Sequence, residues 1–229
     1  MSAAALAPAP SLRSPLLRFS SDDKLIAVVR RGREDAFEVL FERYRPRLLA
    51  FSRNMLRSTE DAEDVMQEVF VNAYRAIRSD DRKIVAKPWL YRIARNRCLN
   101  ELRRNTPDPV ESMDVFENVA PTTGETVERR EQIDELVTDV KRLPEQQRAA
   151  LLLREMEGLP YQQISEVLDT TVPSVKSLLV RARMGLAEAG EARAMSCDEA
   201  QTSVTRQDEA VRRAGRRHIR HCSDCVSAA

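Results

Sequence analysis

Apolar residues along this chain recur every three or four positions, a spacing that places them on one face of an α-helix. Four such patterns precede residue 105 and predict one helical bundle, over residues 25–31, 34–57, 59–78 and 87–104. Helical periodicity resumes from Glu128 to about Ala189. No strand-like alternation of useful length is present in the sequence. The pattern therefore predicts an all-α protein.

The helical pattern is interrupted where the composition changes. Residues 105–127 carry three prolines and five acids, which is typical of an extended acidic linker. The first fourteen residues are rich in Ala, Pro and Ser and favour disorder. We expect a disordered arm, a four-helix domain, an acidic linker, a second helical domain and a short helical tail, over residues 1–20, 21–105, 106–127, 128–190 and 191–229.

The third predicted helix has an acidic outer face. Its inner face consists of apolar side chains at helical spacing, namely Ala62, Val65, Met66, Val69 and Ala73. Asp61, Asp64 and Glu68 then form a stripe that points outward. Most such stripes are solvated surface, but Val71 also projects outward beside the acids, and an apolar residue within a charged surface favours docking of a partner. On the residues alone, both interpretations stay open.

The fourth predicted helix is rich in arginine. Its buried side consists of residues four apart, namely Leu90, Ala94, Cys98 and Leu102. Arg92, Asn96 and Arg103 lie together on the opposite side, with Arg95, Arg97 and Arg104 at the flanks. Arginines supply contacts to phosphate, and an asparagine among them can hydrogen-bond a base edge. This surface indicates nucleic-acid binding.

Two aromatic residues begin the same helix. Trp89 and Tyr91 are candidates for stacking on unpaired bases, which is how many proteins hold single strands. A position in the hydrophobic core is at least as good an interpretation of Trp89.

Residues 161–183 have the pattern of a helix-turn-helix motif. A short helix over Tyr161–Leu168 is followed by the turn Asp169–Thr171 and by a longer basic helix from Val172. Pro173 is compatible with that helix because it falls in the first turn. The expected inward face is Val175, Leu179, Ala182 and Leu186. The outward edges, suited to the major groove of DNA, are formed by Ser174, Ser177 and Arg181 and by Lys176 and Arg183.

Charge and composition exclude several classes of protein. The net charge of +1 hides a strong segregation of acidic and basic segments. No apolar run is long enough to cross a membrane, and the first ten residues lack the features of a secretory signal. We therefore expect a cytoplasmic protein with no membrane partner. No glycine-rich phosphate loop, Ser/His/Asp set or paired-carboxylate cleft is recognisable, so we do not expect an enzyme.

The tail contains a set of potential metal ligands, namely Cys197, His218, Cys222 and Cys225, with His221 as a spare donor. One histidine and three cysteines complete a tetrahedral zinc site, and the Cys-x2-Cys spacing lets two thiolates bind one ion. The alternative is a disordered tail with incidental cysteines. Five arginines accompany the ligands and could dock on the acidic stripe or bind DNA, namely Arg212, Arg213, Arg216, Arg217 and Arg220.

Together these motifs resemble the extracytoplasmic-function (ECF) sigma factors, the small bacterial specificity subunits of RNA polymerase. Residues 61–70 are similar to the polymerase-binding motif of that family, residues 89–96 to its −10 recognition and melting helix, and residues 143–148 with 161–183 to its −35 recognition domain. The resemblance implies that Asp61, Asp64, Gln67 and Glu68 face the clamp helices of the polymerase core. It also implies that residues 79–87 and Asn96 meet the non-template −10 strand of promoter DNA.

The chain departs from the family pattern in two places. Leu178 and Val180 occupy positions where relatives usually carry Arg and His, which would weaken or alter −35 recognition. The loop over residues 79–87 is unusually charged, so the −10 preference does not carry over.

The spacing of the tail's ligands resembles zinc-binding anti-sigma domains, which normally reside on a separate protein. We hypothesise that this tail regulates the sigma domains in cis, with the zinc-bound thiolates as a possible redox or metal sensor. A separate anti-sigma factor stays possible. The competing interpretation is a helix-turn-helix regulator that never joins polymerase, and it leaves residues 61–70 and 89–104 unexplained.

Overall fold

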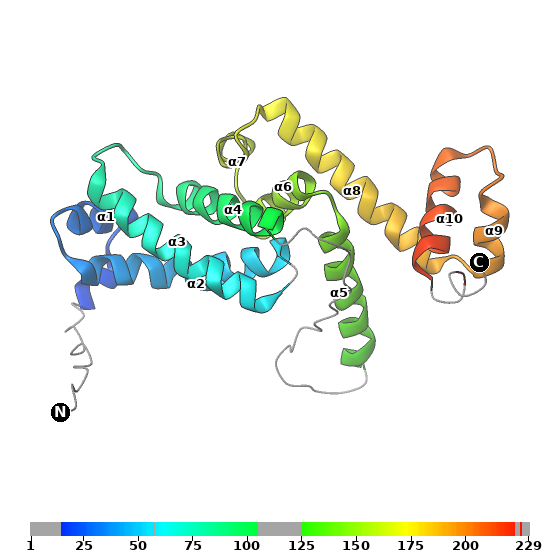
Figure 1. Ribbon diagram of the computed structural model, residues 1–229, viewed down its shortest axis with the longest axis horizontal. Coiled ribbons are helices and arrows are strands. Elements are labelled where there is room, and N and C mark those ends of the chain that lie inside the picture. The colour runs from blue at the N-terminus through cyan, green and yellow to red at the C-terminus, as the bar shows by residue number, and fades with distance from the viewer. Residues whose placement is uncertain (1–14, 57, 105–124, 223–224, 226–229) are drawn as a thin grey trace. The chain divides into compact units, whose positions relative to one another are not determined.

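The computed structural model describes residues 15–56, 58–104, 125–222 and 225, and in these ranges all regular structure is helical (Figure 1). It confirms the all-α prediction. The chain divides into two compact units, one of residues 1–53 and 59–106 and the other of residues 54–58 and 107–229. The predicted acidic linker lies outside the described residues except for its last three, which already belong to a helix. No helix in the described ranges is long and apolar enough to cross a membrane.

The first unit is the predicted four-helix bundle, preceded by a short 3-10 helix. Its elements are η1 (Pro15–Phe19), α1 (Asp22–Arg30), α2 (Glu34–Met55), α3 (Thr59–Ser79) and α4 (Ala86–Arg104). Ser21 caps α1 by accepting a hydrogen bond from the backbone N–H of Lys24. The expectation of disorder up to residue 20 is wrong for the end of the arm. There Arg43 donates hydrogen bonds to the carbonyls of Arg18 and Ser20 and fixes η1 against α2.

Helices α3 and α4 pack against each other and meet the core of the bundle. The five predicted inward residues of α3 are all buried, because each lies on the stripe that faces the neighbouring helices. An aromatic cluster joins α2 to α3, in which Phe70 stands edge-on to Phe41 with ring centroids 4.2 Å apart. The surfaces of α3 and α4 that point away from this core are therefore fixed by apolar packing on their other sides.

The second unit contains the helix-turn-helix and the tail. Its helices are α5 (Glu125–Arg142), α6 (Glu145–Glu155), α7 (Tyr161–Leu168), α8 (Val172–Ala194), α9 (Cys197–Ser203) and α10 (Glu209–His221). Helices α6, α7 and α8 pack pairwise. Asp169 forms the tight turn between α7 and α8 with a φ of 53°, and the hydroxyl of Thr171 caps α8 by accepting from the N–H of Ser174.

Helix α8 is longer than the sequence pattern predicts. It was expected to end near Ala189 but continues to Ala194, so a domain boundary at residue 190 would fall inside it. Ala189 and Ala192 are both buried, and burial of this last part of the helix outweighs the cost of Gly190 in a helix interior. The tail therefore begins directly at the end of the recognition helix.

The tail is a pair of helices packed on α8. Helices α9 and α10 lie side by side, and α10 also contacts α8 (Figure 1). Ser196 and Glu199 form a reciprocal capping box that starts α9. Gly215 of α10 lies so close to α9 that a Cβ there would fall 3.0 Å from the carbonyl oxygen of Ala200 and 1.7 Å from the hydroxyl of Ser203. The backbones of α9 and α10 are therefore in close contact at Gly215, with no room for a larger side chain.

Candidate functional sites

The acidic face of α3 is on the surface, as the sequence predicts. Asp64, Gln67 and Glu68 are exposed and Asp61 is half-buried. Val71 is 42% exposed beside them, so the acidic stripe includes an accessible apolar side chain. The Nδ2 of Asn72 donates to the carbonyl of Glu68 at 2.7 Å. The arrangement supports docking of a basic partner, although a solvated acidic stripe would also be exposed in this way.

The acidic face of α3 adjoins the basic helix α4. Arg97 of α4 and Glu68 of α3 form an ion pair with an Nη1–Oε2 distance of 2.9 Å. Both side chains are more than a third exposed, so the pair contributes little to stability, on the order of 0–1 kcal/mol. Its consequence is geometric, because it marks where the acidic face of α3 meets the basic face of α4.

Helix α4 presents the expected polar face. Leu90, Ala94 and Cys98 are buried, whereas Leu102 is only half-buried. Arg92, Asn96 and Arg103 are exposed on the other side. These three exposed residues can reach a nucleic acid without any rearrangement of the helix.

Two expectations for α4 need correction. Arg95 was placed on an exposed flank but is only 8% exposed, and its Nη1 donates to Oδ1 of Asn96 at 3.4 Å. Tyr91 was a candidate for base stacking but is fully buried, edge-on to Phe51 with centroids 5.4 Å apart. Trp89 is half-buried, so both of its interpretations remain possible. Asn96 is thus supported from behind by Arg95, and the core of the bundle excludes Tyr91 from any contact with bases.

Helix α8 also has the predicted faces. Val175, Leu179 and Ala182 are buried, and Leu186 is half-buried. Lys176, Ser177, Arg181 and Arg183 are exposed, and Ser174 is half-buried near the capping hydroxyl of Thr171. Arg183 pairs with Glu155 of α6 at 2.7 Å, which holds that guanidinium and raises its pKa. Val180 is 55% exposed, so the departure from the family pattern lies on the surface.

The four predicted metal ligands of the tail come together. The ligand atoms of Cys197, His218, Cys222 and Cys225 all lie within 4.8 Å of one another. The Sγ atoms of Cys197 and Cys222 are 3.7 Å apart. Sulfur atoms bound at about 2.3 Å to one tetrahedral ion would lie roughly 3.8 Å apart, so this distance fits a shared metal. The cluster could therefore hold a metal ion. The side chain of His221, the spare donor, lies outside the described residues.

The histidine of this cluster is oriented for coordination. The Nδ1 of His218 lies 2.8 Å from the carbonyl oxygen of Ala192, which can only accept, so Nδ1 carries the proton. Nε2 is then a bare acceptor, and it is buried without a hydrogen-bond partner among the described residues. A backbone carbonyl that fixes the tautomer in this way is the usual support for a metal-bound histidine. Sequence reasoning missed Ala192, because its contribution is a backbone atom.

The thiols of the cluster form hydrogen bonds with one another. Hydrogen bonds with Cys225 and Cys222 raise the pKa of Cys197 to about 12. A bound metal replaces these protons, so metal affinity falls as the pH is lowered.

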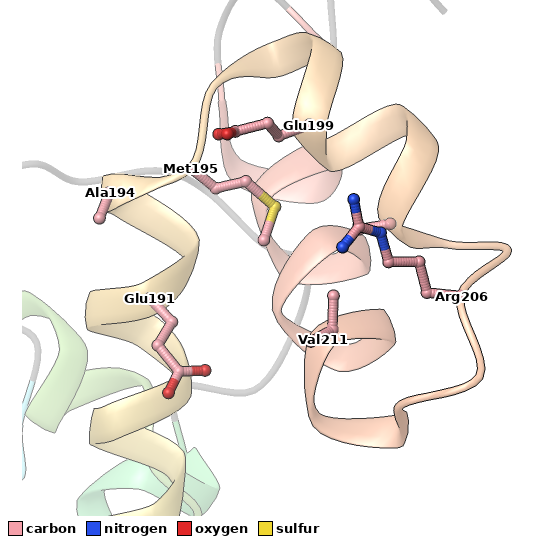
Figure 2. Close-up of a pocket in the computed structure, with 7 residues that line it drawn as sticks. Glu191, Ala194, Met195, Glu199, Arg206 and Val211 are labelled. Atoms are coloured by element: carbon pink, nitrogen blue, oxygen red, sulfur yellow. The ribbon is translucent and has the colours of Figure 1, made fainter.

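A hollow of 320 Å³ lies between the end of α8 and the two tail helices (Figure 2). The side chain of Met195 projects into the space between the end of α8 and α10, and Glu191, Glu199 and Arg206 border it. None of the four cluster residues lines this hollow. We assign no ligand to it.

The five tail arginines fall into three sets. Arg213 and Arg217 pair with Glu188 of α8 at 3.2 and 3.7 Å, and Arg217 also donates to the carbonyl of Gly185 at 2.7 Å. Arg212 pairs within α10 with Glu209. Arg216 and Arg220 are exposed. Sequence reasoning did not identify Glu188, although it continues the polar spacing of α8 beyond Arg181.

Two family profiles match the chain, "Sigma-70 region 2" over residues 40–107 and "Sigma-70, region 4" over residues 134–186. They coincide with the two helical domains just described and define a sigma-70-type protein. The region 4 match ends before the tail begins.

The curated relatives specify the group. The chain is 35% identical over 185 residues to the RNA polymerase sigma-H factor of Pseudomonas aeruginosa, covering 76% of this chain and 96% of that protein. It is 34% identical to the ECF RNA polymerase sigma-E factor of Haemophilus influenzae, covering 71% and 92%. It is 33% identical to the ECF RNA polymerase sigma factor SigM of Mycobacterium tuberculosis, covering 73% and 83%. The chain belongs to the ECF sigma factors of the sigma-70 family.

Solved structures agree on the fold. CnrH, in a complex with the cytosolic domain of CnrY, superposes with a TM-score of 0.58 at 23% identity, covering 77% of this chain and all of that one. The sigma factor RpoE of Bartonella quintana, in a complex with the anti-sigma factor NepR, gives 0.57 at 21% identity, covering 68% and 96%.

Proposed function

We propose that this chain directs bacterial RNA polymerase to promoters and takes part in opening them, and that its tail binds zinc and regulates this activity. Its membership in the ECF sigma factors carries the first part. The regulator that never joins polymerase finds no support in the relatives, which are named as polymerase sigma factors. Family membership also agrees with the expectation that the chain is not an enzyme.

The contact to core polymerase is proposed at the acidic stripe of α3, namely Asp61, Asp64, Gln67 and Glu68. The exposed carboxylates of Asp64 and Glu68 attract a basic partner, and Val71 beside them adds an apolar contact. Burial of the opposite face of α3 holds these side chains in a fixed register.

The contact to the −10 strand is proposed at α4, through Trp89, Arg92, Asn96 and Arg103. Arg92 and Arg103 are placed to contact phosphate, and Asn96 to hydrogen-bond a base edge. Arg95 belongs to this site as a positioning residue, since its guanidinium is buried behind Asn96.

The contact to the −35 element is proposed at α8, through Ser174, Lys176, Ser177, Arg181 and Arg183. The first turns of a recognition helix enter the major groove, and Lys176, Ser177 and Arg181 are exposed on α8. The ion pair of Arg183 with Glu155 leaves Lys176 and Arg181 as the more available cations.

Zinc is proposed as the metal of the tail. Three thiols and one imidazole are the ligands that structural zinc prefers, and the 3.7 Å sulfur separation and the oriented His218 fit a tetrahedral ion. When bound, zinc would supply structural cross-linking of α9 and α10. Cys197 follows the end of α8 after only two residues, and His218 hydrogen-bonds to the carbonyl of Ala192. Loss of the metal would therefore alter the contacts at the end of the recognition helix.

Run-off transcription tests the proposal. Purified full-length chain is added to core polymerase on a promoter library and compared with a chain lacking residues 195–229, with and without chelator. We expect promoter-specific transcripts from the full chain and an altered yield from the shortened one. Absence of transcripts together with failure to co-purify with core polymerase would refute the sigma assignment. Equal output in all four conditions would refute only regulation by the tail.

A further inference from the structure

The tail docks on the same face of α8 that carries the proposed DNA contacts. Ser174, Ser177 and Arg181 are spaced three and four residues apart, and the tail contacts Gly185, Glu188 and Ala192 continue that spacing. Steps of 4, 3 and 4 residues after Arg181 stay on one face of a helix with 3.6 residues per turn. Glu188 lies roughly 10 Å along the helix from Arg181, at about 1.5 Å per residue. The docked tail is therefore next to the DNA-facing surface.

Helix α10 brings positive charge to this position. Arg213, Arg216, Arg217 and Arg220 are spaced i, i+3, i+4 and i+7, so they share one side of α10, which we call the basic edge. Two of its members bind Glu188, and this contact places the basic edge beside the recognition face. The other two, Arg216 and Arg220, are exposed.

Glu188 explains why the docked tail matters to a polyanion. A carboxylate on the DNA-facing side of α8 repels phosphate. In the docked state its side chain is only 16% exposed and faces two guanidinium groups. The docked tail thus covers the carboxylate of Glu188 and places positively charged guanidinium groups at this point of the recognition face.

We propose that the basic edge of α10 is a second DNA-contacting element, which binds duplex phosphates flanking the segment recognised by α8. This inference rests on the proposed binding of duplex DNA by α8. Arg216 and Arg220 make the phosphate contacts, whereas Arg213 and Arg217 orient α10 through Glu188. Such contacts are independent of sequence, so they lengthen the DNA footprint without changing the preferred −35 sequence.

The test is the salt dependence of binding. The full chain is titrated against a labelled duplex of arbitrary sequence by fluorescence anisotropy, between about 50 and 200 mM salt. The variant R216Q/R220Q should lower the slope of log K against log salt by about 1.8, since each phosphate contact contributes about 0.9. Affinity near 0.1 M salt should fall by roughly tenfold or more. Metal content and helicity should be unchanged, because both residues are exposed.

Two further variants make the result decisive. R45Q/R47Q removes the same charge from exposed positions of α2 and should leave the slope unchanged. R181Q tests the proposed −35 surface on which the inference depends. A reduced slope in R181Q with a parental slope in R216Q/R220Q overturns the inference and leaves the proposed function standing. A parental slope in R181Q and in R216Q/R220Q overturns both the inference and the proposed −35 contact of α8. If the arginines instead bind the acidic stripe of the same chain, R216Q/R220Q keeps or gains duplex affinity, which also overturns the inference.

Discussion

The two arginine-rich helices, α4 and α10, carry similar side chains but are held in place by different forces. Helix α4 buries Leu90, Tyr91 and Cys98 in the core of its bundle, so apolar packing fixes the position of its exposed arginines. Among the apolar residues of helix α10 with described burial, only Ala214 and Gly215 are buried. Small side chains bury little apolar area, at about 0.8 kcal/mol per CH2 group, and cannot hold a helix alone. We therefore expect the position of α10 to depend on the proposed metal and on its polar contacts to α8.

Removal of the metal should produce the largest difference in behaviour between α4 and α10. Chelation, or C222S, takes away a cross-link for which apparent binding free energies are about 10–16 kcal/mol in zinc-finger peptides. We expect α9 and α10 to lose protection against hydrogen exchange, while α4 stays protected. Hydrogen exchange followed by mass spectrometry, with metal content measured on the same samples, checks this.

The matched control is C98A, which removes the buried thiol of α4. It should leave the metal content of the chain unchanged, since Cys98 is not part of the cluster. If α10 stayed protected in the metal-free protein, packing and ion pairs would suffice to hold it, and the contrast with α4 would be wrong.

The same contrast explains what the sequence could and could not predict. The inward residues of α3 were identified correctly because an amphipathic helix on a large core shows its burial directly in its spacing. Arg95 was misplaced because Tyr91 was treated as a surface aromatic. Arg95 lies four residues after Tyr91 and three before Cys98, on the side of the helix that both of them bury.

The tail shows a different limit. The four residues of its cluster were predicted from their spacing alone, because metal coordination requires a specific pattern of residue types, and the structure brings them together. Its docking on α8 was not predicted, because Glu188 is an ordinary charged residue in sequence and the carbonyl of Ala192 has no sequence signature. The extension of α8 through Gly190 was missed for the same reason, since packing partners distant in sequence outweigh local propensity.

A methyl group between α9 and α10 should have the next largest effect. In G215A the new Cβ would collide with the hydroxyl of Ser203 and crowd the carbonyl of Ala200, so the helices must move apart. We expect the tail to lose about 1–3 kcal/mol of stability, as for other overpacked interfaces, and to bind metal more weakly. Competition with a chromogenic chelator and hydrogen exchange of α10 would measure both.

G190A provides the comparison for this change. A Cβ at Gly190 would meet only Nη2 of Arg193, at 4.0 Å, and alanine favours the helix interior by about 1 kcal/mol. It should therefore keep or improve stability. Equal effects of the two substitutions would mean that the close approach of α9 and α10 is not needed for metal binding.

The ion pairs between α10 and α8 should have the smallest effect on the tail's stability. E188Q removes one charge from both pairs, in which the side chains of Arg213 and Arg217 are 47% and 37% exposed. Exposed pairs are worth about 0–1 kcal/mol, so we expect a loss of that order and unchanged metal content. A double-mutant cycle with R217Q, read by hydrogen exchange of α10, isolates the coupling between the two residues.

The size of that coupling decides how α10 is held. E155Q, which breaks the pair of Glu155 with Arg183 between α6 and α8, gives the reference for an exposed pair in the same unit. A coupling near that reference leaves the metal as the main force and Glu188 as the residue that sets the orientation of the basic edge. A loss of about 3 kcal/mol or more would instead place Glu188 among buried charges that cannot be left without a partner. Docking of the tail on α8 would then depend on charge. Helix α10 would still differ from α4, which is held by apolar packing, but ion pairs rather than the metal would be the reason.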